Sequence, residues 1–349
     1  MRAAVLHAPH DLRLEERPEP EPGPGDVLIE VTYNGLCGTD ATEYTKGPLM
    51  VPLTVAHPGS GHVGPTILGH EFIGTVVDAG PDARSWLGRR VASGAGVSCG
   101  QCGWCRQGRT NLCARYYTLG LSTHGGLGQF VAAPAATLRA IPDDCPDLEA
   151  ALAQPLAVGL HAVSRAGVRP GDTVAVLGTG AIGSFLLAGL AGHDGEVVAF
   201  DVDRARLDTA RQLGATRTVL IAPDISPEDV AEHMPGGAEV VLECAGVPGS
   251  VQRAFALAAR GGRVLLVGLT KQAQPLELAD VVLREIDVRT TVAHVCDTDL
   301  PAALELLTRR PLSPLVLDRV EPLHDIVAVF DRLAAGGARG KIVVDARRG

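Results

Sequence analysis

The sequence predicts an α/β protein of two domains, one rich in short β-strands and one built on a doubly wound parallel sheet. The chain has 349 residues, and a single hydrophobic core stops growing at about 250–300 residues. The hydrophobic pattern also changes near residue 152, from short β-type runs separated by Gly and Pro to alternating strand and helix signals.

The N-terminal part, to about residue 152, has the pattern of a distorted all-β unit. Its strand-like runs are "DVLIEVTY", "FIGTVVDAG", "RRVASGAG" and "GQFVAAP". The tail, 293–349, contains one helix signal, "DLPAALELLTRR", and one strand signal, "KIVVDA". The tail therefore adds a helix and a strand to whichever domain it joins.

The middle part, 153–292, alternates between strands and amphipathic stretches, which predicts a Rossmann-type doubly wound sheet. The strand-like runs are "TVAVLG", "EVVAFD", "TRTVLI", "AEVVLEC", "RVLLVGL" and "DVRTTVA". Residues 174–192 form an uncharged run long enough to resemble a membrane span. Because five glycines interrupt it, we expect a buried strand, a glycine turn and a helix instead.

The glycine turn in this run reads G-x-G-x-x-G, with Gly178, Gly180 and Gly183. In a dinucleotide-binding turn the first glycine allows the tight bend, the second lets backbone amides approach a pyrophosphate, and the third permits close helix packing. Asp201 ends the next predicted strand. A carboxylate there accepts hydrogen bonds from the ribose hydroxyls and repels a 2′-phosphate, so the pattern favours NAD over NADP.

Four cysteines lie within fifteen residues, in "CGQCGWCRQGRTNLC": Cys99, Cys102, Cys105 and Cys113. Four thiolates this close satisfy the tetrahedral coordination of Zn²⁺ and leave no open position, which predicts a structural zinc. Two local disulfides and an iron–sulfur cluster are the alternatives. Disulfides fit less well because nothing upstream resembles a secretory signal.

Composition excludes some classes of partner. The net charge is −9, and aromatic residues make up 3% of the chain. Nucleic-acid binding requires a basic surface, so neither nucleic acid nor a membrane is expected as a partner. Apart from these four cysteines and Cys37, which is discussed below, the chain has Cys145, Cys244 and Cys296, and three unpaired thiols fit a cytoplasmic location.

Several motifs follow one another along the chain in a specific order. "GLCGTD" contains Cys37, Thr39 and Asp40, and "GHEFIGTVVDAG" contains His70 and Glu71. The cysteine group, "PGDTV", "VAVLGTGAIG", "LECAG" and "GKIVV" come after them. In this order the motifs resemble the zinc-containing medium-chain dehydrogenase/reductase (alcohol dehydrogenase) family, from near residue 1 to near residue 345.

The resemblance implies a division into domains. Residues 1–152 and 293–349 correspond to a GroES-like catalytic domain, with a structural zinc lobe at about 95–115, and 153–292 to a Rossmann NAD-binding domain. The long Gly/Pro-rich stretch 45–66 is more similar to the butanediol and polyol (sorbitol-type) dehydrogenases than to the primary-alcohol enzymes.

The resemblance also implies a catalytic zinc bound by Cys37, His70 and Glu71, with one coordination position open. Asp40 would then hold His70 in its metal-binding tautomer. Thr39 would hydrogen-bond the substrate oxygen and begin removal of its proton. The expected cofactor-binding residues are Gly178, Gly180, Ile182, Gly183, Asp201 and Arg206, the last at a position where related enzymes place a basic residue on the ribose.

Two residues depart from the family pattern. Thr42 stands where many relatives carry the histidine that ends the proton relay, so the proton is expected to leave by water or another group, with His57 and His62 as candidates. Gln154 stands where the polyol branch has a zinc-binding Glu. Its neutral amide could coordinate zinc weakly or hold the zinc water; the alternative is that it only packs near the domain junction.

These inferences predict a zinc- and NAD-dependent enzyme that transfers hydride between NAD and a secondary alcohol, a small diol, polyol or cyclitol. The alternatives are an amino-alcohol substrate, as in the threonine dehydrogenase branch, and non-redox chemistry with the same cofactors. The resemblance further implies a homo-oligomer, a tetramer or a dimer.

Overall fold

The computed structural model describes residues 1–270 and 272–348. The chain divides into two compact units. The first unit consists of Met1–Ala157 and His294–Gly349, and the second consists of Val158–Ala293. The C-terminal segment thus returns to the unit that the N-terminal segment began.

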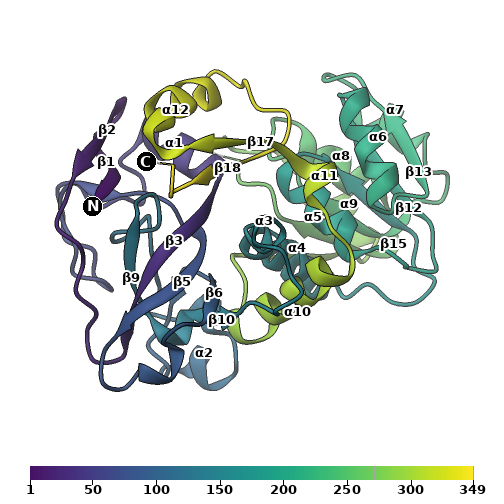
Figure 1. The fold of residues 1–349 in the computed structure, drawn as a ribbon. Coiled ribbons are helices and arrows are strands. Elements are labelled where there is room, and N and C mark those ends of the chain that lie inside the picture. Colours follow the sequence, from purple (N-terminus) through teal and green to yellow (C-terminus); the bar gives the residue numbers. More distant parts are fainter. Residues whose placement is uncertain (271, 349) are drawn as a thin grey trace. The chain divides into compact units, whose positions relative to one another are not determined.

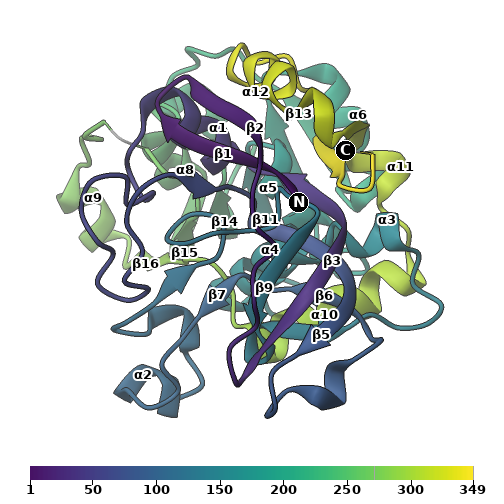
Figure 2. The ribbon, with the colours of Figure 1, turned by 60° about the vertical axis from the view of Figure 1, so that its left-hand side comes forward.

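The first unit is organised around one long strand, β3 (Asp26–Leu36), which Figure 2 shows beside its neighbours. It pairs antiparallel with β5 (Glu71–Ala79), β9 (Phe130–Pro134) and β18 (Lys341–Asp345). The sheet is completed by β6 (Arg90–Ser93), β10 (Leu138–Ala140) and β17 (Leu317–Pro322), in the order β10-β6-β5-β3-β18-β17. All four strand-like runs predicted for this part are confirmed as strands.

Two smaller sheets and several short helices complete the first unit. The sheets are β2-β1-β4, from β1 (Arg2–Ala8), β2 (Asp11–Glu16) and β4 (Thr66–Ile67), and the pair β7 (Gly96–Val97) with β8 (Tyr117–Thr118). The helices are α1 (Gly38–Lys46), α2 (Gly103–Arg106), α3 (Asp147–Ala150), α10 (Cys296–Arg309), α11 (Ser313–Val316) and α12 (Ile326–Ala334), with 3-10 turns at Arg84–Trp86, Thr110–Leu112, Ala135–Thr137 and Leu323–Asp325. Helix α4 (Ala153–Ala166) runs across the division between the two units.

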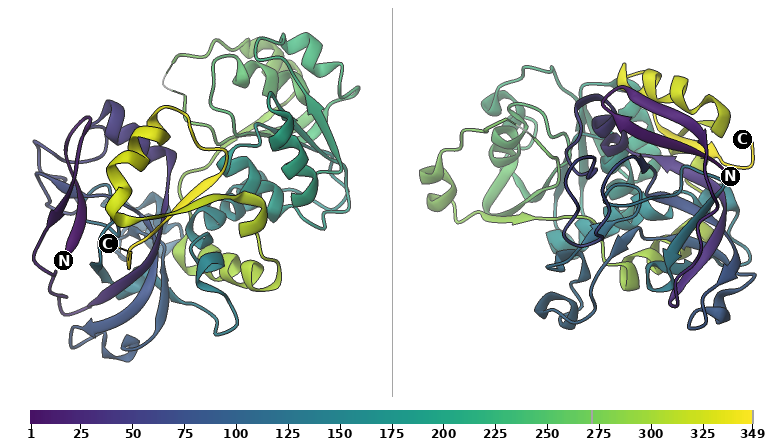
Figure 3. Two further views of the ribbon diagram at one scale, coloured as in Figure 1. Left: turned by 45° about the horizontal axis from the view of Figure 1, so that its top comes forward. Right: turned by 90° about the vertical axis from the view of Figure 1, so that its left-hand side faces the viewer.

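The hydrophobic core explains why the tail joins the first unit. Ile342 and Val344 of β18 are buried together with Val329 and Phe330 of α12 and with Leu6 of β1. Figure 3 shows this last segment, in yellow, against the purple N-terminal strands. Every residue of β18 is buried, including a lysine at its first position.

The second unit contains six parallel strands in the order β13-β12-β11-β14-β15-β16, and the predicted doubly wound sheet is confirmed. The strands are β11 (Val174–Leu177), β12 (Val197–Asp201), β13 (Arg217–Leu220), β14 (Ala238–Glu243), β15 (Ala258–Leu266) and β16 (Asp287–Thr290). Its helices, visible in Figure 1, are α5 (Ala181–Gly189), α6 (Arg204–Leu213), α7 (Pro227–Ala231), α8 (Ser250–Leu257) and α9 (Leu278–Leu283). The strand order reverses between β11 and β14, the place where such sheets bind ligands at their carboxyl ends.

The apolar run 174–192 forms β11, a turn and α5, as the glycines predicted. Strand β11 is buried along its whole length, which is typical of a central parallel strand. Within residues 1–270 and 272–348, no helix has the length and apolar character needed to cross a membrane.

Candidate active site and metal centres

Two adjacent strands bring Cys37, His70 and Glu71 together. Gly35 of β3 pairs with Glu71 at the start of β5, and Cys37 follows two residues later as the N-cap of α1. The sulfur of Cys37, one ring nitrogen of His70 and one carboxylate oxygen of Glu71 lie within 4.8 Å of one another. One thiolate, one imidazole and one carboxylate form a donor set suited to zinc with a position left open.

Asp40 contacts two members of this cluster. It is fully buried, its Oδ2 accepts a hydrogen bond of 2.9 Å from the Cys37 backbone N–H, and its Oδ1 lies 3.3 Å from His70 Nδ1. This places Asp40 where it can fix the His70 ring and leave Nε2 for a metal. Burial lowers the pKa of His70, but the Asp40 carboxylate and the Cys37 sulfur outweigh it, and the net pKa is well above the ordinary value. Thr39 Oγ1 lies 3.7 Å from Cys37 Sγ.

Lys341 of the motif "GKIVV", which was not predicted as a site residue, adds a positively charged group to the cluster. Its Nζ donates a hydrogen bond of 2.5 Å to Glu71 Oε1, and Lys341 and Glu71 are only 5% and 2% exposed. A side chain at Gly35 would collide with this pair, since a Cβ there would lie 2.3 Å from Glu71 Oε2. Burial lowers the pKa of Lys341, yet the negative groups Glu71, Cys37 and Asp40 raise it overall. The lysine is therefore a stable cation beside Glu71.

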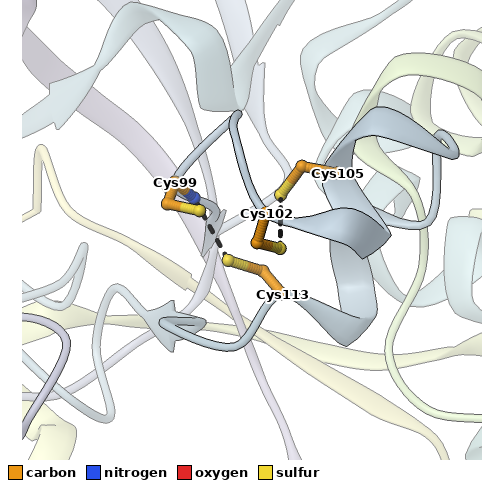
Figure 4. A group of neighbouring side chains, drawn as sticks. All are labelled: Cys99, Cys102, Cys105 and Cys113. Carbon is orange, nitrogen blue, oxygen red and sulfur yellow. Dashed lines mark hydrogen bonds between the residues drawn. The ribbon is translucent and has the colours of Figure 1, made fainter.

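The four cysteines of the lobe form a second cluster, shown in Figure 4 with their sulfurs facing one another. The four sulfur atoms all lie within 4.8 Å of one another. Cys113 Sγ accepts backbone N–H groups from Cys99 at 3.2 Å and from Arg115 at 3.3 Å. All eight cysteines of the chain are free thiols. The donor set fits a closed tetrahedral zinc site.

Backbone amides also favour the thiolate form in part of this lobe. The N–H of Gln101 is the main cause that lowers the pKa of Cys99 to about 6. The N–H of Cys105 likewise lowers the pKa of Cys102. Burial, together with the Cys102 sulfur, raises the pKa of Cys105 to about 11, so metal binding must displace a proton there.

The predicted dinucleotide turn lies in the second unit between β11 and α5. Gly178 has φ +92°, a left-handed conformation that favours glycine, and a Cβ at Gly183 would lie 2.0 Å from the Gly178 carbonyl oxygen. Gly180 is the N-cap of α5, and nothing lies within 4 Å of where its Cβ would be. Ile182 follows in the first turn of α5. An open helix N-terminus with bare backbone amides fits a pyrophosphate group.

Asp201 lies at the carboxyl end of β12, next to this turn. It is 5% exposed, and its Oδ2 accepts hydrogen bonds from the backbone N–H of Thr179 at 2.7 Å and from the Thr179 hydroxyl at 2.9 Å. Arg206 Nη1 lies 3.9 Å from Asp201 Oδ1. The partnership of Thr179 with Asp201 was not predicted, although Thr179 lies inside the glycine motif.

Three of the other residues named from the sequence, Thr42, His57 and His62, make hydrogen bonds within their own segments of the chain. Thr42 Oγ1 donates to the Gly38 carbonyl at 2.8 Å, within α1. His57 Nδ1 accepts the backbone N–H of Gly59 at 3.1 Å, and His62 Nε2 lies 2.9 Å from Thr66 Oγ1. Gln154 lies in the first turn of α4. Its approach to zinc stays a prediction.

Comparison with known proteins agrees with this arrangement. The family model "Alcohol dehydrogenase GroES-like domain" matches residues 23–143, and "Zinc-binding dehydrogenase" matches residues 181–309. Sorbitol dehydrogenase of Ovis aries is 35% identical over 347 residues, covering 95% of this chain and 93% of the relative. The chain belongs to the zinc-containing medium-chain dehydrogenase/reductase family, as the motifs predicted.

Solved structures extend the comparison to the whole fold. 2R,3R-butanediol dehydrogenase from Bacillus subtilis has a TM-score of 0.88 with 28% identity, and 99% of each chain is covered. A zinc-binding dehydrogenase from Sinorhizobium meliloti 1021 bound to NADP has a TM-score of 0.85 with 30% identity, covering 99% of this chain and 98% of that one. This protein is thus a zinc-dependent alcohol or polyol dehydrogenase that uses a nicotinamide dinucleotide, with the predicted combination of GroES-like and Rossmann folds.

Proposed function

We propose that this enzyme oxidises a secondary hydroxyl of a small diol, polyol or cyclitol with NAD, or reduces the corresponding ketone. The observation that carries the proposal is the cluster of Cys37, His70 and Glu71 with Asp40 against it. The similarity to sorbitol and butanediol dehydrogenases supports a substrate with neighbouring hydroxyl groups. It does not favour the amino-alcohol alternative.

The residues of the cluster have distinct roles in this reaction. Cys37, His70 and Glu71 would hold the zinc, with Asp40 fixing His70, and Gln154 as a further weak ligand. When bound, zinc polarises the substrate hydroxyl and lowers its pKa. Thr39 would accept a hydrogen bond from that hydroxyl and take part in removing its proton. A bound nicotinamide would supply the acceptor for the hydride that leaves the carbon bearing the hydroxyl. One alcohol and NAD thus yield one ketone, NADH and one proton.

The proton leaves by water in this proposal. Thr42, which replaces the relay histidine of many relatives, donates its hydroxyl hydrogen to Gly38 within α1. His57 Nδ1 and His62 Nε2 both have local partners in their own loop. These contacts favour solvent over a side-chain relay.

The second unit would bind the cofactor through its glycine turn. Gly178, Gly180, Ile182 and Gly183 receive the pyrophosphate at the start of α5. Asp201 accepts a ribose hydroxyl and repels a 2′-phosphate, which favours NAD. The side chain of Arg206, 44% exposed and close to Asp201, reaches the same ribose without reversing that preference.

We also propose a homo-oligomer that assembles through β16. This strand is at the edge of the parallel sheet. Val288 on it is 45% exposed, and Val282 and Leu283 of the preceding helix are 71% and 72% exposed. An unpaired edge beside apolar side chains is suited to pairing with a second copy of this chain. Light scattering should show a smaller assembly for Val288→Lys than for the unmodified protein.

The proposed compartment is the cytoplasm. The lobe and the cluster require five cysteines as thiolates or thiols, and all eight cysteines are free. A reducing compartment keeps them available for metal.

One screen tests the proposed reaction. The zinc-loaded protein is assayed with diols, sugar alcohols, cyclitols and threonine, each with NAD or NADP, by absorbance of the reduced nicotinamide. Turnover of a secondary alcohol with NAD is expected, and Cys37→Ser should abolish it while the lobe keeps its metal. Preference for threonine would contradict the substrate class, and the absence of turnover at full zinc content would contradict the redox reaction.

A further inference from the structure

The Asp201 carboxylate has more partners in the protein than a simple ribose acceptor needs. Its Oδ2 accepts the backbone N–H and the hydroxyl of Thr179, and its Oδ1 accepts the backbone N–H of Asp203 at 3.0 Å. A carboxylate offers about four lone-pair positions. Three are occupied, so one position, on Oδ1, is left to accept a cofactor hydroxyl.

Thr179 is itself held firmly. It is 2% exposed, and its carbonyl accepts the Ser184 hydroxyl at 3.1 Å from the first turns of α5. The preceding Gly178 donates its N–H to the Phe200 carbonyl of β12 at 2.8 Å. The glycine turn is therefore attached to the end of β12 by one backbone hydrogen bond, from Gly178, and by the bonds between Thr179 and the Asp201 side chain.

This arrangement fixes the direction of the carboxylate. A partial rotation of Asp201 about its Cβ–Cγ bond would change the directions of both carboxylate oxygens, for example toward Arg206, whose Nη1 is 3.9 Å from Oδ1. The Thr179 hydroxyl opposes this rotation because a hydrogen bond to a charged acceptor is stronger than one between neutral groups. The acceptor position on Oδ1 then stays aimed away from Thr179.

We propose that Thr179 is a positioning residue for nucleotide selection: its hydroxyl holds Asp201 so that Oδ1 accepts a ribose hydroxyl. The proposal rests on the proposed preference for NAD. Loss of the hydroxyl leaves the charge of Asp201 in place, so repulsion of a 2′-phosphate persists. Loss of the Thr179 hydroxyl therefore lowers the affinity for the cofactor with an unphosphorylated ribose and reduces the ratio of the affinities for NAD and NADP.

Calorimetric titration of the full chain tests this without turnover. The probes are ADP-ribose and the form of it that is phosphorylated at the adenosine 2′-oxygen; they correspond to NAD and NADP without the nicotinamide ring. Thr179→Val removes the hydroxyl and keeps the backbone N–H, and Thr179→Ser is the matched control. Thr179→Val should weaken ADP-ribose binding about three- to tenfold, the range of one hydrogen bond. It should leave the phosphorylated probe nearly unchanged, and Thr179→Ser should restore the original ratio.

The outcomes separate the two proposals. If the unmodified protein prefers ADP-ribose and Thr179→Val lowers only the melting temperature, with the ratio of the two affinities unchanged, Thr179 is merely structural and the inference is wrong. If the unmodified protein prefers the phosphorylated probe, the NAD preference itself fails. Thr179→Ala repeats the test should the valine variant fail to fold.

Discussion

The ammonium group of Lys341 lies 2.5 Å from a carboxylate oxygen of Glu71, and both side chains are buried beside Cys37. With a metal on Nε2 the His70 ring would be neutral, and the cluster, Asp40 included, would then hold three groups that can be negative and one fixed cation. The two negative charges that remain match one divalent ion. The net charge of the cluster therefore suits a divalent metal ion even though Glu71 is already paired with Lys341.

Lys341→Met should destabilise the metal-free protein by about 3–5 kcal/mol, because it leaves the Glu71 carboxylate buried without its cation. With zinc bound, the metal supplies positive charge beside Glu71, so Lys341→Met should lower the free energy of unfolding by less. Chemical denaturation of the metal-free and zinc-loaded forms measures both values.

Lys341→Arg serves as the control, since it keeps the charge and should retain most of the stability. Equal destabilisation of both forms by Lys341→Met would mean that Glu71 does not exchange Lys341 for the metal, and that the pair is a structural ion pair only.

The sequence was sufficient to predict the fold and the two groups of candidate metal ligands. It was not sufficient to predict the residues that contact those ligands. Cys37, His70 and Glu71 lie in short motifs that are typical of metal ligands. A buried parallel strand such as β11 can be predicted because its residues form an apolar run. Lys341 contacts Glu71 across 270 positions of chain, and only the pairing of β3 with both β5 and β18 brings them together. One signal was available: Lys341 is one of three lysines in the chain, and the three residues that follow it in the strand are apolar.

Thr179 shows a different limit. Its position inside the glycine motif predicted a loop residue, but the side-chain bond to Asp201 depends on how the turn rotates relative to β12. Patterns of residue type do not report that rotation. The structure thus shows that Asp201 also holds the glycine turn in place through Thr179. The spacing of residues in the motif does not predict this contact.

Cys102→Ser tests the lobe. Structural zinc sites contribute about 10–16 kcal/mol of binding free energy in small zinc peptides, so the variant should lose stability or solubility before it loses chemistry. Metal analysis should find up to two zinc ions per chain in the unmodified protein, one for each cluster, and one in the variant. A lobe found metal-free in protein purified without chelator would contradict the structural zinc site.

A pH dependence of stability is expected from His124. Burial, with His62 and Arg17 nearby, lowers the pKa of His124 from 6.5 to about 4. The unfolded chain therefore takes up a proton at a higher pH than the folded one, and the free energy of unfolding should decrease as pH falls from 6.5 toward 4. His124→Asn, which keeps an acceptor for the Ile67 N–H, should flatten this slope. His324→Asn, at a side chain 53% exposed, is the control, and an equal effect of both would exclude His124 as the cause.

Gln154→Glu tests whether position 154 contacts the metal site. With Cys37, Glu71 and Asp40 negative and Lys341 positive, the cluster carries two negative charges, so a glutamine at position 154 leaves the zinc-loaded cluster near neutral. A glutamate would add a negative charge that opposes ionisation of the substrate hydroxyl, because a nearby anion disfavours formation of another. The pKa that limits kcat/KM for alcohol oxidation should therefore rise, by about one unit if the carboxylate reaches the site, and zinc should be retained more tightly during dialysis against chelator. Gln154→Ala, which changes packing without adding charge, should not move that pKa. If Gln154→Glu leaves both the pH profile and the zinc content unchanged, Gln154 only packs in the first turn of α4 and has no part in the metal site.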